Sequence, residues 1–312
     1  MQSENILQVK NLTKNYSSFC AVDNISFVVP KGKVIGLLGP NGAGKTTTIQ
    51  TLLGITLANG GMIRYFGKDF FTNREWCLAR INFTSSFNNL QGRITVWENL
   101  LVFAYLYSVK DPEKKIMELI SYFEVEDLLH KRFVTLSAGQ KTRINLIKSL
   151  INDPKLILMD EPTAALDPDI ADKTLSLIEE MRKSKALSIL YTSHDMAEVT
   201  RICDEVIFLD RGKIVAHDTP LGLTKRIRNA TLKLTFDGDK NVVENYLKEQ
   251  KQNFSFPQRY CVVIKTKEME IPKLIFGISN AGIWITDIDV QKPTLEDVFL
   301  QIARKGKVYV SK

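Results

Sequence analysis

The sequence predicts an α/β protein built from two units, and three observations lead to that prediction. Short apolar, β-branched runs alternate with helical patterns over the first two thirds of the chain, which is typical of an α/β sheet. Several of these runs are apolar throughout, as central strands covered on both faces are. After about residue 228 a shorter alternation of strands and helices begins, and a chain of 312 residues suits two domains.

The first unit contains three kinds of pattern. Segments 6–16 and 24–32 alternate apolar and polar residues, as strands of a half-exposed antiparallel sheet do. Between about 95 and 150 the pattern is helical: Thr95 and Glu98 form a capping box ahead of an apolar stripe, and Pro112 begins a second helix. Continuous apolar runs predict strands at 34–38, 81–85, 156–160, 187–193 and 205–210.

The second unit is predicted to fold separately. The basic stretch TKRIRN, residues 224–229, is the candidate boundary, so the predicted domains are 1–228 and 229–312, with a helical subdomain at about 88–150. The pattern predicts strands at 230–236, 260–266 and 283–291, and helices at 241–250, 270–280 and 294–304.

Composition excludes several classes of protein. No apolar run reaches the roughly 18 residues that span a bilayer, and the first residues do not read as a secretory signal. The cysteines are scattered without metal spacing and are predicted to be reduced thiols: Cys20, Cys77, Cys203 and Cys261. The net charge of +7 does not distinguish nucleotide, nucleic acid and membrane as partners.

GPNGAGKT, residues 39–46, matches the P-loop pattern G-x-x-x-x-G-K-S/T after a predicted strand and before a helical pattern. Glycines let the backbone curl so that its N–H groups cradle phosphates. Lys45 is expected to reach the β- and γ-phosphates, and the Thr46 hydroxyl to bind magnesium. The alternative, a chance glycine-rich turn, does not explain the flanking strand and helix. The predicted nucleotide-binding residues are Gly39, Pro40, Asn41, Gly42, Ala43, Gly44, Lys45, Thr46 and Thr47.

Acidic and histidine residues follow two other predicted strands. Asp160 ends its strand at the edge where α/β proteins bind ligands, and can hold the magnesium shell. Glu161 comes next and is a candidate general base for an attacking water. His194 could hydrogen-bond the γ-phosphate, and Asp167 lies in a proline-containing loop. Taken alone, His194 would more often be structural, Asp167 a cap or turn residue, and each acid a solvated strand end.

TLSAGQKTRINLIKSL, residues 135–150, predicts a helix with Ser137 at its N-cap. A helix start built from Ser, Ala and Gly exposes backbone N–H groups, which together with the helix dipole favour an anion. This stretch therefore predicts a second anion-binding position, although the P-loop already provides one about a hundred residues earlier.

Together these motifs resemble the ATP-binding subunits of ABC transporters. The P-loop, LSAGQ at 136–140, LILMDE at 156–161, AALD at 164–167 and SHD at 193–195 follow that family's order and spacing. LSAGQ is a one-residue variant of the family's LSGGQ signature, and Tyr16 matches the aromatic residue that stacks on adenine; otherwise Tyr16 is a surface aromatic of a strand. The segment 289–305 resembles the tail of the ATPase subunits of type-2 exporters of drugs, lipids or polysaccharides.

The resemblance implies a P-loop NTPase (RecA-like) cassette with an antiparallel β subdomain and a helical subdomain, plus a small C-terminal α+β domain. It implies ATP and Mg²⁺ as ligands, with Lys45, Glu161 and His194 catalytic. In that family two cassettes pair head to tail, each lending its signature to the other's ATP, so the chain is expected to form a homodimer or a heterodimer. Ser137, Gly139 and Gln140 would then act in trans, and Asp167 would also contact nucleotide.

The resemblance also implies partners and a location. A separate transmembrane permease subunit is expected to bind near residues 88–130, with the chain peripheral on the cytoplasmic face of the cell membrane. No nucleic acid is expected. The alternatives are a soluble ABC ATPase acting on nucleic acid or ribosomes, which usually has two cassettes or a long coiled-coil insertion, and a P-loop kinase or regulatory module, which leaves LSAGQ and His194 unused.

One position departs from the family pattern. Most members have a Gln that contacts the magnesium ion and the attacking water, and counting back nine residues from Thr95 places Ser86 there. A Ser side chain is shorter and would reach the ion through a bridging water or not at all. In the alternative alignment, Ser86 is a strand-end residue and Gln91 does this work through a shifted loop.

Overall fold

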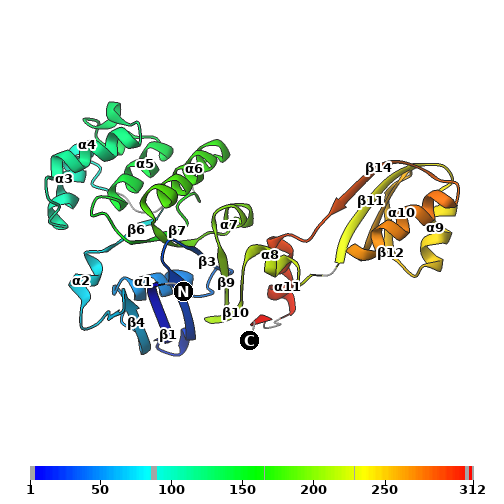
Figure 1. The fold of residues 1–312 in the computed structure, drawn as a ribbon, viewed down its shortest axis with the longest axis horizontal. Helices are drawn as coiled ribbons and strands as arrows, with labels where there is room; N and C mark the ends of the chain where they lie inside the picture. The colour runs from blue at the N-terminus through cyan, green and yellow to red at the C-terminus, as the bar shows by residue number, and fades with distance from the viewer. Residues whose placement is uncertain (1–3, 86–89, 165, 228, 306–308, 311–312) are drawn as a thin grey trace. The chain divides into compact units, whose positions relative to one another are not determined.

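A computed structural model describes residues 4–85, 90–164, 166–227, 229–305 and 309–310. It divides into two compact units, one formed by residues 1–220 with 305–312 and the other by residues 221–304 (Figure 1). The division comes just before the basic stretch at 224–229. The last residues return to the first unit, because β15 (Tyr309–Val310) pairs in parallel with β10 (Lys213–Asp218).

The described strands of the first unit include a seven-stranded sheet of order β15-β10-β9-β3-β8-β7-β6. The predicted apolar runs form its buried centre, and the neighbours among these central strands pair in parallel. Their bounds agree with the sequence prediction to within a residue or so. They are β3 (Val34–Leu38), β6 (Ile81–Ser85), β7 (Leu156–Asp160), β8 (Ser188–Thr192) and β9 (Glu205–Asp210).

An antiparallel sheet of order β2-β1-β4-β5 packs in the same unit. As predicted, its long strands alternate buried and exposed residues. Its buried face shares one apolar core with β3, β7 and α1, so the P-loop strand has packed side chains around it. The elements are β1 (Asn5–Tyr16), β2 (Phe19–Pro30), β4 (Gly60–Tyr65), β5 (Lys68–Asp69), α1 (Lys45–Leu52) and α2 (Arg74–Leu78).

The helical segment consists of α3 (Val96–Leu106), α4 (Pro112–Tyr122) and α5 (Ala138–Ser149), with two short 3-10 turns (Glu126–Leu128 and Phe133–Thr135) between α4 and α5. Figure 1 shows these helices on the side of the first unit away from β1 and β4. The predicted capping box is confirmed: Thr95 Oγ1 accepts from Glu98 N, and Glu98 Oε2 accepts from Thr95 N at 2.7 Å. Pro112 begins α4 as predicted, and the side chain of Asp111 before it makes no capping bond.

Two further helices lie in the described part of the first unit, α6 (Pro168–Lys185) and α7 (Met196–Ile202). A third, α8 (Pro220–Thr224), follows where the chain passes into the second unit. The last of these begins at the division between the units. None of the helices in the described ranges combines the length and apolar character needed to cross a bilayer.

The second unit is a four-stranded antiparallel sheet of order β12-β13-β11-β14 with helices packed against it. The predicted elements are present as β11 (Asn229–Asp237), α9 (Lys240–Glu249), β13 (Cys261–Lys267), α10 (Ile271–Asn280), β14 (Trp284–Gln291) and α11 (Leu295–Lys305). Sequence analysis missed β12 (Asn253–Gln258), which contains Pro257. It is an edge strand, where a residue without an N–H group is tolerated.

A buried lysine lies where α5 packs against β6. Lys148 Nζ donates to the Phe83 carbonyl oxygen at 2.7 Å and to Asn82 Oδ1 at 3.3 Å. It also lies 5.3 Å from the centroid of the Phe103 ring on α3. Burial lowers the pKa of this ammonium from 10.5 to about 8. The Lys148 side chain therefore joins the helical segment to β6, the strand that ends just before residue 86. Burial disfavours the charged form of this side chain.

This geometry predicts a pH-dependent stability. Between about pH 8 and pH 10.5 the unfolded chain holds the Lys148 proton and the folded chain does not, so the native state gains stability as pH rises. Relative to Lys148→Met, the unfolding free energy of the native protein should rise with a slope of up to about 1.4 kcal/mol per pH unit. Urea unfolding of both proteins at several pH values in this window measures the difference; a difference that stays constant with pH would contradict it.

Candidate functional site

The P-loop leaves the carboxyl end of β3 with three glycines in backbone conformations that other residues rarely adopt. The φ angles are 153° at Gly39, 79° at Gly42 and 104° at Gly44. A Cβ at Gly39 would lie 2.3 Å from the Leu209 carbonyl oxygen, and one at Gly44 would lie 2.4 Å from the Ala21 carbonyl oxygen. Two of the glycines are therefore required by backbone packed against the loop, while Gly42 faces open space.

Lys45 begins α1 and folds back over the loop. Its Nζ donates to the Gly39 carbonyl oxygen at 2.7 Å and to the Pro40 carbonyl oxygen at 3.3 Å, and the residue is only 7% exposed. Burial lowers the pKa of this ammonium, while the carboxylates of Glu161 and Asp160 raise it. A positive charge is thus held at the centre of the loop, where a triphosphate would need it.

Asp160 stands at the carboxyl end of β7, in register with Ser85 of β6 and Thr192 of β8. Its Oδ1 accepts from Thr192 Oγ1 at 2.6 Å, and its Oδ2 lies 3.5 Å from Thr46 Oγ1. The predicted pair of Thr46 and Asp160 is therefore brought together. Sequence analysis missed Thr192, which orients the carboxylate. The signal was its place at the end of a buried strand, directly before SHD.

Glu161 and His194 also meet: Glu161 Oε2 lies 3.3 Å from His194 Nδ1. The Glu161 backbone has a φ of 50°, in the left-handed region, which costs about 1 kcal/mol for a residue with a side chain. Its N–H donates to the Thr192 carbonyl oxygen at 3.1 Å and to Thr192 Oγ1 at 3.0 Å. These bonds hold the backbone in a conformation that turns Glu161 toward His194.

The oxygen donors here suit magnesium. Hydroxyl and carboxylate oxygens are the ligands that Mg²⁺ takes, usually with phosphate oxygens and water completing the octahedron. Among the described residues no group of three or more His, Cys, Asp or Glu could hold a metal ion. Ser86 lies outside the described residues. Gln91 lies next to α3, where its backbone N–H donates to Asn99 Oδ1 at 2.9 Å.

The stretch that begins α5 forms a capping box that sequence analysis did not recognise. Gln140 N donates to Ser137 Oγ at 3.3 Å, and Ser137 N donates to Gln140 Oε1 at 3.0 Å. The signal was the Ser-x-x-Gln spacing itself. Among the described residues the N–H groups of Ala138 and Gly139 have no acceptor. A Cβ at Gly139 would lie 2.6 Å from Ile170 Cγ2 of α6, so glycine permits close packing here.

The remaining predicted residues lie at element ends. Tyr16 ends β1 with 44% of its surface exposed, and Lys14 Nζ lies 4.8 Å from the centroid of its ring. Asp167 occupies the N-cap position of α6, but its side chain makes no capping hydrogen bond. Within the described chain, no hydrogen bond or ion pair joins the first turn of α5 to the P-loop.

The two kinds of P-loop glycine predict different effects of alanine. Gly44→Ala places a methyl group against the Ala21 carbonyl oxygen as well as straining φ, and should destabilise the protein by more than about 2 kcal/mol. Gly42→Ala meets only the strain, about 1 kcal/mol. Urea midpoints of the two variants without nucleotide measure the effect. Equal losses would contradict the packing argument.

Comparison with known proteins gives consistent matches. A family model described as ABC transporter matches residues 22–164. Nod factor export ATP-binding protein I from Rhizobium johnstonii (strain DSM 114642 / LMG 32736 / 3841) is 30% identical over 302 residues, covering 95% of this chain and 94% of that protein. Nod factor export ATP-binding protein I from Ralstonia nicotianae (strain ATCC BAA-1114 / GMI1000) is 37% identical over 220 residues, covering 69% of this chain and 67% of that protein.

Solved structures agree. The ATP-binding subunit of an ABC transporter superimposes with a TM-score of 0.63 at 28% identity, covering 71% of this chain and 92% of that chain. The cassette MJ1267 of an ABC transporter, in its ADP conformation, gives a TM-score of 0.62 at 26% identity, covering 69% of this chain and 91% of that chain. The predicted fold class, an ABC cassette of the P-loop NTPase type, is confirmed. The chain therefore belongs to the ABC transporter family, as an ATP-binding and ATP-hydrolysing subunit.

Proposed function

We propose that this chain drives export of a cargo through a separate transmembrane subunit, using the energy of MgATP bound at its P-loop. The observation that carries the proposal is the meeting of Thr46, Asp160, Glu161 and His194 beside the P-loop lysine. Export is supported by the relatives named as Nod factor export proteins, whose similarity extends over 95% of this chain, including its second unit.

The geometry supports a distinct role for each group. The P-loop amides and Lys45 would hold the phosphates, while Thr46 Oγ1 and Asp160 would hold a magnesium ion that neutralises phosphate charge. Glu161 would take a proton from the attacking water, and His194, 3.3 Å from its carboxylate, would orient that carboxylate and contact the γ-phosphate. Tyr16 offers an exposed ring for the adenine. Ser86, placed by the sequence pattern alone, would reach the metal through a bridging water or not at all.

Two copies would be needed for a complete site. The unpaired N–H groups of Ala138 and Gly139 begin a helix of 12 residues, which favours an anion at that end. Ser137, Gly139 and Gln140 would reach the γ-phosphate bound to a partner cassette, with Asp167 beside them. Because Ser137 and Gln140 already satisfy each other, the capping box would present the backbone donors in a fixed arrangement.

The membrane subunit would bind on α3 and α4. These neighbouring helices expose large apolar side chains at Val102, Tyr105, Leu106 and Met117, with Leu106 72% exposed. An apolar patch of this kind on a soluble surface marks a protein contact. Docking there would place the chain on the cytoplasmic face of the membrane. Residues 221–304 would form an accessory unit that nucleotide binding does not require, since every nucleotide motif precedes it.

The trans arrangement predicts the behaviour of Glu161→Gln. The amide keeps the shape of the side chain but cannot take a proton, so hydrolysis should fall at least about a hundredfold while ATP binding persists. ATP should then accumulate a dimer that is measurable by size-exclusion chromatography with light scattering. Lys45→Ala is the matched control, which should neither bind ATP tightly nor dimerise. A Glu161→Gln protein that binds ATP and stays monomeric would contradict the proposal.

The docking surface makes a separate prediction. Leu106→Asp should leave ATP binding and folding unchanged, because the side chain is exposed, but it should remove most of the chain from the membrane fraction of its native cells. Leu57→Asp, at a position 67% exposed outside this surface, is the control and should stay membrane-associated. Equal membrane recovery of the two variants would show that α3 is not the contact.

A further inference from the structure

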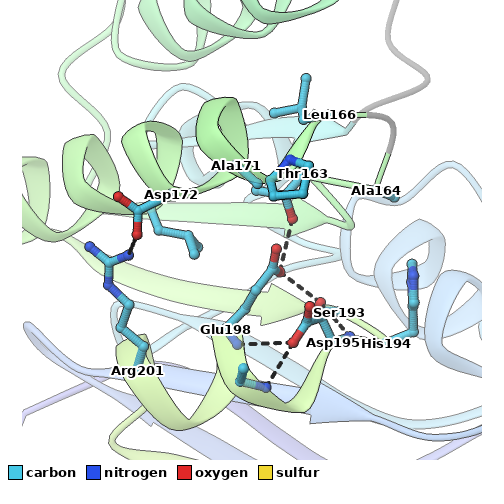
Figure 2. Close-up of a pocket in the computed structure, with 13 residues that line it drawn as sticks. Thr163, Ala164, Leu166, Ala171, Asp172, Ser193, His194, Asp195, Glu198 and Arg201 are labelled. Carbon is cyan, nitrogen blue, oxygen red and sulfur yellow. Dashed lines mark hydrogen bonds and ion pairs between the residues drawn. The ribbon is translucent and has the colours of Figure 1, made fainter.

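A buried carboxylate links the two loops that carry Glu161 and His194. Glu198 lies on α7 and is 8% exposed. One of its oxygens, Oε2, accepts from Thr163 Oγ1 at 2.8 Å, from Ser193 Oγ at 2.8 Å and from Tyr191 OH at 2.9 Å. All three donor residues are buried as well. Figure 2 shows Glu198 between Thr163 on one side and Ser193 on the other.

Two of these donors lie on the segments that carry Glu161 and His194. Thr163 lies two residues after Glu161, on the segment that joins β7 to α6, and Ser193 directly precedes His194 on the segment that joins β8 to α7. Glu198 therefore fastens both segments to one point. Its own helix is fixed in turn, because Asp195 Oδ1 accepts from Ala197 N at 2.8 Å and from Glu198 N at 3.2 Å.

The Thr163 segment borders open space as well as packed side chains. A cavity of about 440 Å³ borders it, lined by Thr163, Ser193 and Glu198 on the inside and by Asp172 and Arg201 farther along the helices (Figure 2). Close-packed side chains would otherwise restrain such a segment. The Glu161 backbone is also held in a left-handed conformation, which relaxes unless neighbouring bonds restrain it. The hydroxyl bonds to Glu198 are restraints of that kind.

We propose that Glu198 is a positioning residue for hydrolysis, which holds Glu161 and His194 at their working separation through the hydroxyls of Thr163 and Ser193. This inference rests on the proposed roles of Glu161 and His194. Misplacement of a reacting group by about 1 Å can cost about a hundredfold in rate, so loss of one tether should reduce turnover without weakening nucleotide binding.

The alternative is that Glu198 merely satisfies three buried hydroxyls, each of which would cost about 1–3 kcal/mol if left without a partner. Tyr191 separates the two readings. Its hydroxyl donates to the same oxygen as Thr163 does, at nearly the same distance, but from within β8. Its contact with Thr163 Oγ1 is longer, at 3.5 Å. Tyr191→Phe therefore removes one bond to Glu198 and leaves the Thr163–Glu198 tether in place, whereas Thr163→Val removes that tether.

The test compares full-length Thr163→Val, Tyr191→Phe, Thr163→Ser and the native protein by ATPase kinetics, ATP binding and thermal unfolding. We expect Thr163→Val to lose about tenfold to a hundredfold in kcat with KM within about twofold. Tyr191→Phe should lose a similar amount of stability and keep its kcat within about twofold. Thr163→Ser, which restores the hydroxyl, should recover most of the kcat.

Equal kcat values for Thr163→Val and Tyr191→Phe would overturn the inference, as would failure of Thr163→Ser to recover. If Thr163→Val does not fold, Glu198→Gln decides the matter, because the neutral amide oxygen cannot hold three donors as the carboxylate does. Lowered kcat with intact ATP binding would support the inference, and unchanged kcat would overturn it. A native protein without ATPase activity would instead refute the proposed function.

Discussion

The in-register pairing of β7 with β6 and β8 is the constraint on which the rest of the site depends. It sets Asp160 between Ser85 and Thr192 at one edge of the sheet, and β3 releases the P-loop at the same edge because it pairs in parallel with β8. A shift of one residue would turn the Asp160 side chain to the opposite face. Thr46, Glu161 and His194 lie close to one another because the strands that precede them end at the same edge of the sheet.

The phosphate-holding and signature parts of the molecule are built on different principles. At the P-loop, backbone packed against Gly39 and Gly44 fixes the curve, and a buried ammonium supplies charge. At α5, a capping box fixes the first turn and leaves two backbone donors unpaired. The P-loop and the first turn of α5 each have a fixed structure of their own. The P-loop has the ammonium, and α5 has the unpaired backbone donors. This division of donors between separate elements is the physical basis of the proposal that two cassettes share a site.

Much of the fold could be predicted from the sequence where local pattern decides. The runs 34–38, 81–85, 156–160 and 205–210 became strands with those bounds, because continuous apolar character requires burial on both faces. The strands at 60–65, 213–218 and 253–258 were missed for different reasons. The first pairs with β1, far along the chain, whereas the other two pair with a strand adjacent in sequence and were missed because their own patterns are weak. Thr192, Thr163 and Glu198 were missed because their roles exist only once β7, β8 and α7 are side by side. Gln140 was assigned to nucleotide, and its capping bond to Ser137 was overlooked.

Mixing two inactive variants tests the shared site most directly. Lys45→Ala keeps the signature and loses the P-loop charge, whereas Ser137→Arg keeps the P-loop and places a bulky cation at the start of α5. Each alone should hydrolyse little ATP. When the two are mixed at equal concentration, an intact P-loop meets an intact signature across the dimer, and the account predicts that ATPase activity appears. Activity in Ser137→Arg alone, or no activity in the mixture when mixed dimers have formed, would contradict a site completed by the partner.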